Sequence, residues 1–316
     1  MSDTYARTDV SAFLAAVKDT PLARVEAYSA VEVRALIAAA RQQQPESEIE
    51  LPVVSDFDCP GPAGPIPSRL FDPRTERSEG CGIVFLHGGG FVFGDLDSHA
   101  SICAQIALAS DLPVISVGYR LAPEDPWPAG PDDAEAAARW LAGPDAAPVV
   151  GRKFTNLIIA GDSAGANLAA VTARALALDP AEAPVIAQWL FYPVTGSRTT
   201  PSRTLFEEGY LLTRAALAWF EKAYSPAVDG TRYDLMTDNL EIMPPTLLVT
   251  AGLDPLRDEG RAYAAALTAA GVEVVFQEAK GNIHGFLGLG AAIPSSLDDI
   301  RRALLAVKFL TSVACR

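Results

Sequence analysis

The sequence predicts an α/β protein with a mostly parallel, eight-stranded sheet, helices on both sides of it and a small helical cap. From Gly82 onward, short and almost continuously apolar segments alternate with segments of helical periodicity. Strands buried on both faces are apolar throughout, and their alternation with helices is typical of a parallel sheet. Only the segment between Pro193 and Ile242 interrupts this alternation.

The chain begins with helices. Apolar residues recur at helical spacing over residues 8–44, and Pro21 divides the run. The helical spacing of apolar residues then ends. IELPVVSDF and IPSRLF have the composition of strands on either side of the turn CPGPAGP. These two segments are the first two expected strands.

Six more strands and five helices follow. The strands are GIVFLH, PVISVGY, NLIIAG, PVIAQWLFY, TLLVTAG and VEVVF, and the helices are SHASICAQIALAS, DDAEAAARWLAG, AGANLAAVTARALAL, EGRAYAAALTAAG and LDDIRRALLAVKFLTSV. The interrupting segment contains two helical pieces and no core strand, so we expect it to pack with the N-terminal helices. We therefore predict N-terminal cap helices over residues 1–48, an α/β domain over 49–194 and 236–316, and inserted cap helices over 195–235.

Charge and composition exclude several classes of partner. With 25 basic and 39 acidic residues the formal net charge is -14, which repels nucleic acids and anionic membranes. No stretch of about 18 apolar residues predicts a membrane span, and the N-terminus does not resemble a signal peptide. We expect a cytoplasmic protein. The four cysteines form no CxxC pair and only three histidines exist, so no metal site is predicted.

The stretch IIAGDSAGANLAA places Ser163 between Gly161 and Gly165, after a strand and before a helix. This is the context that the pattern G-x-S-x-G requires for a nucleophilic serine. A sharp turn from strand to helix holds the side chain above the sheet, and its neighbours must be small. The alternative is an ordinary helix N-cap, but the flanking strand and helix favour a nucleophile.

A serine nucleophile needs a base and a group that orients the base. The candidates for the base are His87, His99 and His284, and His284 follows the last predicted strand. His99 is expected in the first turn of a helix, with a structural role. Asp254 directly follows the strand TLLVTAG, at the strand end where sites of α/β proteins form. The chain order Ser163, Asp254, His284 is that of the α/β-hydrolases.

The glycine-rich segment HGGGFVFGD follows the strand GIVFLH. Its glycines come close to a dinucleotide-binding pattern, but aromatic residues follow in place of a helix, and the next strand leads to Arg120 rather than to an acid. We favour an oxyanion hole, because glycines let backbone N–H groups approach a negatively charged oxygen. The N–H of Ala164, directly after the nucleophile, would be a further donor.

Together HGGGF, YRLAPE, GDSAGANLA, DPLRDEG and HGF resemble, in order and context, the hormone-sensitive-lipase-like family of α/β-hydrolases, in particular its bacterial carboxylesterases of the GDSAG branch. The resemblance extends from about Ile83 to the C-terminus and implies the α/β-hydrolase fold. It implies that Ser163 is the nucleophile, His284 the base and Asp254 the orienting acid. It further assigns the oxyanion donors to Gly88, Gly89 and Ala164, a shaping role to Gly90, a structural role to His87 and a buried scaffold role to Glu124.

The function implied is hydrolysis of short- to medium-chain acyl esters through an acyl-enzyme, without metal or cofactor. An amide or N-acetyl substrate would use the same triad and remains an alternative. A non-catalytic receptor for a small ligand is a further alternative, although the presence of His284 argues for an enzyme. Phe91, Tyr210 and Leu211 are the candidates for substrate binding. The strand VEVVFQEA could offer a sheet edge to a homodimer.

Overall fold

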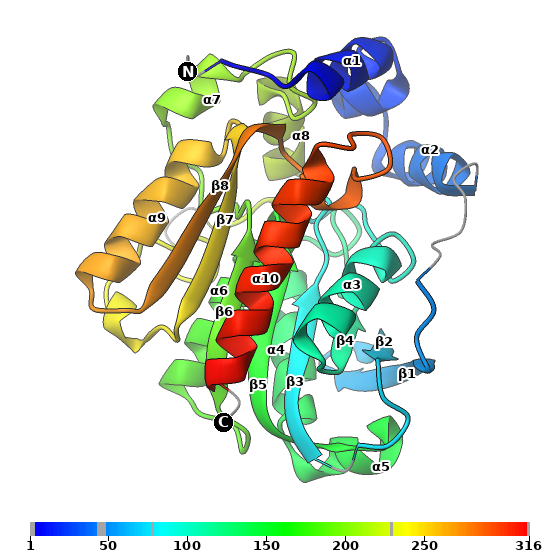
Figure 1. Cartoon of the computed structure of the whole chain (residues 1–316), viewed down its shortest axis with the longest axis vertical. Coiled ribbons are helices and arrows are strands. Elements are labelled where there is room, and N and C mark those ends of the chain that lie inside the picture. The colour runs from blue at the N-terminus through cyan, green and yellow to red at the C-terminus, as the bar shows by residue number, and fades with distance from the viewer. Residues whose placement is uncertain (1–3, 43–48, 78, 228–229, 315–316) are drawn as a thin grey trace.

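One eight-stranded sheet runs through the molecule in the computed structural model, which describes residues 4–42, 49–77, 79–227 and 230–314 (Figure 1). The strand order is β1-β2-β4-β3-β5-β6-β7-β8. Strand β2 pairs antiparallel with β1 and β4, and all other neighbouring strands are parallel. The predicted α/β class and mostly parallel sheet are confirmed. The strands are β1 (Val53–Gly61), β2 (Gly64–Asp72), β3 (Glu79–Leu86), β4 (Val114–Val117), β5 (Lys153–Asp162), β6 (Val185–Phe191), β7 (Thr246–Leu253) and β8 (Val274–Ile283).

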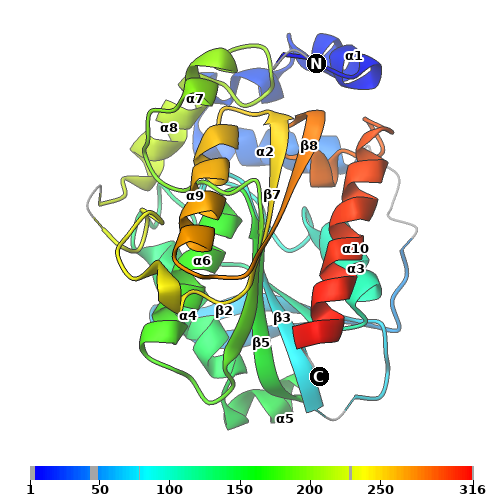
Figure 2. The same ribbon diagram turned by 60° about the vertical axis from the view of Figure 1, so that its left-hand side comes forward.

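Helices cover both faces of the sheet. Helices α3 and α10 lie on one face, and α4, α6 and α9 lie on the other (Figure 2). The α-helices are α1 (Thr8–Val17), α2 (Ala30–Gln42), α3 (Ala100–Ser110), α4 (Ala129–Leu141), α5 (Ala147–Val150), α6 (Ala164–Leu178), α7 (Pro201–Leu205), α8 (Arg214–Tyr224), α9 (Arg257–Ala269) and α10 (Ser296–Ala314). Short 3₁₀-helices are η1 (Pro21–Ala27), η2 (Pro144–Ala146), η3 (Leu240–Ile242) and η4 (Phe286–Gly288). None of the helices in the described ranges is long and apolar enough to cross a bilayer.

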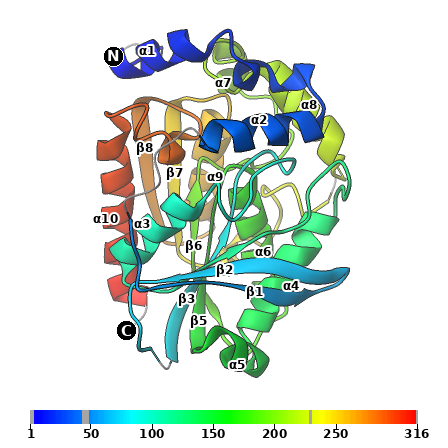
Figure 3. The same ribbon diagram turned by 90° about the vertical axis from the view of Figure 1, so that its right-hand side faces the viewer.

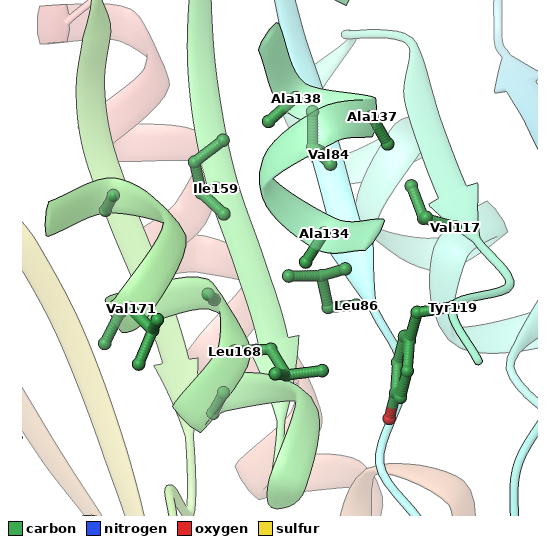
Figure 4. Packing of buried hydrophobic residues seen from close by; sticks show 14 of the residues in the cluster. Val84, Leu86, Val117, Tyr119, Ala134, Ala137, Ala138, Ile159, Leu168 and Val171 are labelled. Carbon is green, nitrogen blue, oxygen red and sulfur yellow. The ribbon is translucent and has the colours of Figure 1, made fainter. Parts of the chain in front are cut away.

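Small side chains bring α4 close to the sheet. Ala134 and Ala137 of α4 are fully buried, and Figure 4 shows Ala134 beside Leu86 of β3 and Ala137 pointing toward Val117 of β4. Leu168 of α6 belongs to the same cluster. Alanine on the contact face lets a helix approach a strand at the density of a protein core. The close packing of α4 and α6 on the sheet therefore supports the ends of β3 and β5, from which the next loops depart.

The last strand is longer than its apolar pattern predicts. The segment VEVVF predicts a strand over residues 272–276, but β8 begins at Val274 and continues to Ile283. This strand lies at the sheet edge, where one side is partly solvated, and its second half is rich in polar residues. Apolar periodicity therefore does not reveal its full length. The extension has a consequence for the site, because β8 ends directly before His284.

Helices α1, α2, α7 and α8 form a cap at one end of the sheet (Figure 3). Helices α1 and α2 from the N-terminus lie beside α7 and α8 from the later insertion (Figure 3). Val25, Val33 and Ala216 form a small buried cluster between the two segments. The boundary predicted at residue 48 lies outside the described residues.

Two neighbouring apolar residues of α3 test how far this packing stabilises the fold. Ile106 is 1% exposed in the core, whereas Leu108 is 51% exposed on the same helix. We expect Ile106→Ala to lower the free energy of unfolding by about 2–5 kcal/mol, because it leaves a cavity. Leu108→Ala should change it by at most about 0.5 kcal/mol. Urea denaturation followed by circular dichroism measures both, and equal effects would contradict the packing described here.

Candidate active site

Ser163 stands at a strained turn between β5 and α6. Its backbone angles are φ +54° and ψ −119°, a conformation that a residue with a side chain adopts only when its surroundings enforce it. A Cβ atom on Gly161 would lie 2.4 Å from the Gly165 carbonyl oxygen, and one on Gly165 would lie 2.0 Å from the carbonyl oxygen of Leu86. Both glycines are therefore required for the close crossing that exposes Ser163 at the tip.

The structure brings the three residues of the predicted triad together. The Ser163 Oγ lies 2.8 Å from Nε2 of His284, and Nδ1 of His284 lies 2.7 Å from Oδ2 of Asp254. The Asp254 carboxylate can only accept a hydrogen bond, so Nδ1 of His284 donates to it. Nε2 is then free to accept the proton of the serine hydroxyl. This is the arrangement needed to activate a serine.

Each partner of Ser163 follows a separate parallel strand. Asp254 follows β7 and is 0% exposed, and its second oxygen, Oδ1, accepts the backbone N–H of Leu256 at 2.8 Å. A buried carboxylate needs such hydrogen-bond partners, because burying it without them is costly. His284 follows β8, whose buried Asn282 donates to Oγ of Ser296 at 3.0 Å. The base is thus held by the sheet and by the start of α10.

The glycine loop after β3 lies beside Ser163, but its donors differ from the prediction. The N–H of Gly88 donates to Oδ1 of Asp162 at 2.8 Å, so the prediction that Gly88 is an oxyanion donor is wrong. The N–H groups of Gly89, Gly90 and Ala164 donate to no acceptor within the described part of the chain. These three are the groups available for a negatively charged oxygen near Ser163.

The loop needs glycine for conformational and steric reasons. Gly89 has φ +122° and Gly90 has φ +61°. A Cβ atom on Gly90 would lie 2.2 Å from the Phe220 ring of cap helix α8. The cap therefore packs directly on the backbone of the glycine loop.

The resemblance implies scaffold roles for two residues, and the structure agrees with only one of them. His87 is buried, its Nδ1 donates to the Gly88 carbonyl at 2.9 Å and its ring stacks on Tyr119 at 4.4 Å between centroids. Its structural role is confirmed. Glu124 was expected to be buried, but its side chain is 49% exposed and forms an ion pair with Arg34 of cap helix α2 at 2.8 Å. The motif YRLAPE does not reveal this exposure, because the ion-pair partner comes from the cap.

A cavity of about 400 Å³ opens above Ser163 and His284. Phe91 and Leu211 line it as predicted, but Tyr210 does not. Tyr210 instead packs edge-to-face on Phe206, with 5.2 Å between ring centroids. The other apolar wall residues were not predicted from the sequence and come mainly from the cap: Phe13, Val17, Val25, Ile37, Leu212, Leu217 and Phe220. Their helical periodicity was the only signal, and it does not distinguish cavity walls from packing.

Comparison with known proteins identifies the family. A family model described as alpha/beta hydrolase fold matches residues 83–288, well over half of the chain. The chain is 39% identical over 267 residues to the esterase LipI of Mycobacterium tuberculosis, with 82% of each protein covered. The chain belongs to the hormone-sensitive-lipase-like family of α/β-hydrolases. The resemblance inferred from the motifs is confirmed.

Other known proteins are similar to this α/β-hydrolase over most of their length. The carboxylic ester hydrolase LipN of Mycobacterium tuberculosis is 40% identical over 290 residues, covering 87% of this chain and 76% of LipN. The solved structure of an alpha/beta hydrolase enzyme from the metagenome of Lake Arreo superimposes with a TM-score of 0.88 at 33% identity, covering 98% of this chain and 99% of the other. The predicted α/β-hydrolase fold is confirmed.

Burial of His87 predicts a pH dependence of stability. Burial lowers the pKa of His87 from its ordinary 6.5 to about 4, so the unfolded state binds the proton first as the pH falls. This histidine should therefore cost the fold up to about 3 kcal/mol between about pH 6.5 and pH 4. Denaturation of the wild type and of His87→Gln across this range measures it. We expect a shallower loss in the variant, and parallel curves would contradict the burial argument.

Proposed function

We propose that this protein is a serine carboxylesterase that hydrolyses short- to medium-chain acyl esters through an acyl-enzyme. The observation that carries the proposal is the chain of hydrogen bonds from Ser163 through His284 to Asp254, at 2.8 and 2.7 Å. Family membership supports the reaction class, since the named relatives include an esterase, a carboxylic ester hydrolase and an ethyl acetate hydrolase.

The chemistry follows from these positions. The Ser163 oxygen attacks the ester carbonyl while Nε2 of His284 takes its proton. The N–H groups of Gly89, Gly90 and Ala164 stabilise the oxygen that becomes negative. His284 then protonates the departing alcohol, and a water molecule activated by the same nitrogen releases the acid. Asp254 stabilises the imidazolium that forms in both halves of the reaction.

The shape of the cavity supports the substrate class. A volume of about 400 Å³ lies at the lower end of the range for small-molecule sites. Its walls are mainly aliphatic and aromatic, with Phe91, Phe93 and Phe220 close to the glycine loop. An uncharged acyl group of modest length suits such walls, because burying a charge there without a partner is costly.

Hydrolysis of p-nitrophenyl esters from acetate to dodecanoate tests this proposal. We expect activity to be highest at short and medium chains, because longer chains exceed the cavity. Ser163→Ala should abolish turnover, and Asp254→Asn should lower kcat by about 10⁴-fold through the wrong histidine tautomer. The control is Ser101→Ala, which changes a serine on α3 outside the cavity. A folded wild type that is inactive on every ester, or an active Ser163→Ala, would refute the assignment.

A pair of glycine variants tests the oxyanion loop separately. Gly90 and Gly151 have positive φ angles of +61° and +78°, but only Gly90 lacks room for a Cβ atom. Both changes to alanine should reduce stability by about 1–2 kcal/mol through the strained backbone, and Gly90→Ala should cost more than Gly151→Ala because its methyl group clashes with the Phe220 ring. Only Gly90→Ala should also lower kcat, by about 10²-fold or more, as loss of one oxyanion donor does. Equal kcat values for the two variants would contradict the role of the loop.

A further inference from the structure

The back of the glycine loop is bound to a pair of residues that the reaction itself does not use. Oδ1 of Asp162 accepts the N–H of Gly88 at 2.8 Å and lies 3.2 Å from Nε2 of His99. Asp162 ends β5 directly before Ser163, whereas His99 stands at the N-terminus of α3. The N–H of Gly88 also lies 3.3 Å from Nε2 of His99, so the loop, the start of α3 and the end of β5 meet at one point.

The environment of Asp162 requires a cation or several donors. Asp162 is 5% exposed, and in the described residues its single ion-pair partner is His99. Tyr192 donates its hydroxyl to Oδ2 at 3.4 Å, and the nearby His87 is held neutral at physiological pH by burial. Burial alone would raise the pKa of Asp162, but the contacts with His99 and Gly88 lower it below its ordinary value. The carboxylate is therefore ionised where it holds the loop.

Both ring nitrogens of His99 have partners. Nδ1 of His99 lies 2.9 Å from Oγ of Ser98, and that hydroxyl also lies 2.9 Å from the carbonyl oxygen of Asp95. A neutral ring can accept the Ser98 proton at Nδ1, and a charged ring can donate there while Ser98 turns to Asp95. A hydrogen on Nε2 is available to Oδ1 of Asp162, 3.2 Å away, whereas a ring protonated only at Nδ1 can accept the N–H of Gly88 at Nε2, 3.3 Å away. In both cases the ring of His99 bonds to one member of the Gly88–Asp162 pair.

The bond from Gly88 to Asp162 fixes the first peptide of the loop. Gly88 and Asp162 approach so closely that only glycine fits, because a Cβ atom on Gly88 would lie 2.5 Å from Oδ2 of Asp162. Gly88 is buried, whereas Gly89 and Gly90 are partly exposed toward the cavity. With the Gly88 N–H turned toward Asp162, the next two N–H groups are the ones that remain for substrate.

We infer that His99 and Asp162 are positioning residues that hold the oxyanion loop at a set distance from Ser163. Asp162 is joined to the nucleophile by one peptide bond and to the loop by one hydrogen bond, and Nε2 of His99 lies within 3.3 Å of both partners of that hydrogen bond. The inference rests on the proposed ester hydrolysis. It predicts that loss of the pair weakens binding of the tetrahedral, negatively charged state more than binding of the ester.

The experiment compares His99→Phe, which removes the polar Nε2 from beside Asp162 and Gly88, with His99→Gln, whose amide group can donate or accept a hydrogen bond in its place. For each variant, kcat and KM are measured with p-nitrophenyl butanoate, and affinity is measured for an alkyl trifluoromethyl ketone. Serine adds to such a ketone, its proton passes to His284, and the resulting hemiketal oxygen is negative and occupies the oxyanion hole. Leu108→Ala on the exposed face of α3 is the matched control.

We expect His99→Phe to lower kcat and ketone affinity in parallel, by about 10- to 100-fold, with KM within about threefold of the wild type. His99→Gln should recover most of both losses. A folded His99→Phe with the kcat and ketone affinity of the wild type would overturn the inference, as would a lower kcat with unchanged ketone affinity. If His99→Phe does not fold, a His99→Gln variant with Asp162→Asn added provides the same comparison against His99→Gln alone. A wild type inactive on esters would instead refute the proposed function.

Discussion

The close crossing of β5 into α6 over β3 is the constraint on which the site depends. Gly165 touches the carbonyl oxygen of Leu86 with no room for a Cβ atom, and this contact forces the positive φ angle of Ser163. Leu86 is also the last residue of β3, from which the glycine loop departs. A single steric contact therefore sets the nucleophile and the oxyanion donors side by side, before any polar interaction orients them.

Polar contacts then attach the cap to the loops that carry the chemistry. In the N-terminal segment, Arg7 donates to the Lys280 carbonyl oxygen at 2.9 Å, and Asp9 accepts the N–H of Ser295 at 2.7 Å. These contacts lie on either side of His284. In the inserted segment, the buried Ser202 of α7 donates its hydroxyl to the Pro255 carbonyl at 2.8 Å, next to Asp254. The helices that enclose the substrate cavity are thus anchored on the same loops that hold the base and the acid.

Much of the fold was predictable because most strands are buried on both faces. Their apolar runs have no solvent-facing alternation to obscure them, so their number, their positions along the chain and the mostly parallel class of the sheet follow from the apolar pattern. The edge strand β8 was predicted too short, since its second half contains Lys280, Gly281 and Asn282 and therefore has no continuous apolar run. The triad was predictable because each member follows a strand, and parallel strands bring their carboxyl ends to one edge of the sheet.

The sequence by itself determined the sheet, the turn at Ser163 and the candidates His284 and Asp254, because these depend on local sterics and on periodicity along the chain. Only the tertiary structure decided which glycine N–H groups face the cavity, since the hydrogen bond from Gly88 to Asp162 joins residues 74 positions apart. It also decided that Tyr210 packs on Phe206 while distant cap residues form the cavity wall. Contacts between remote segments leave no periodic trace in the chain, so no local pattern records them.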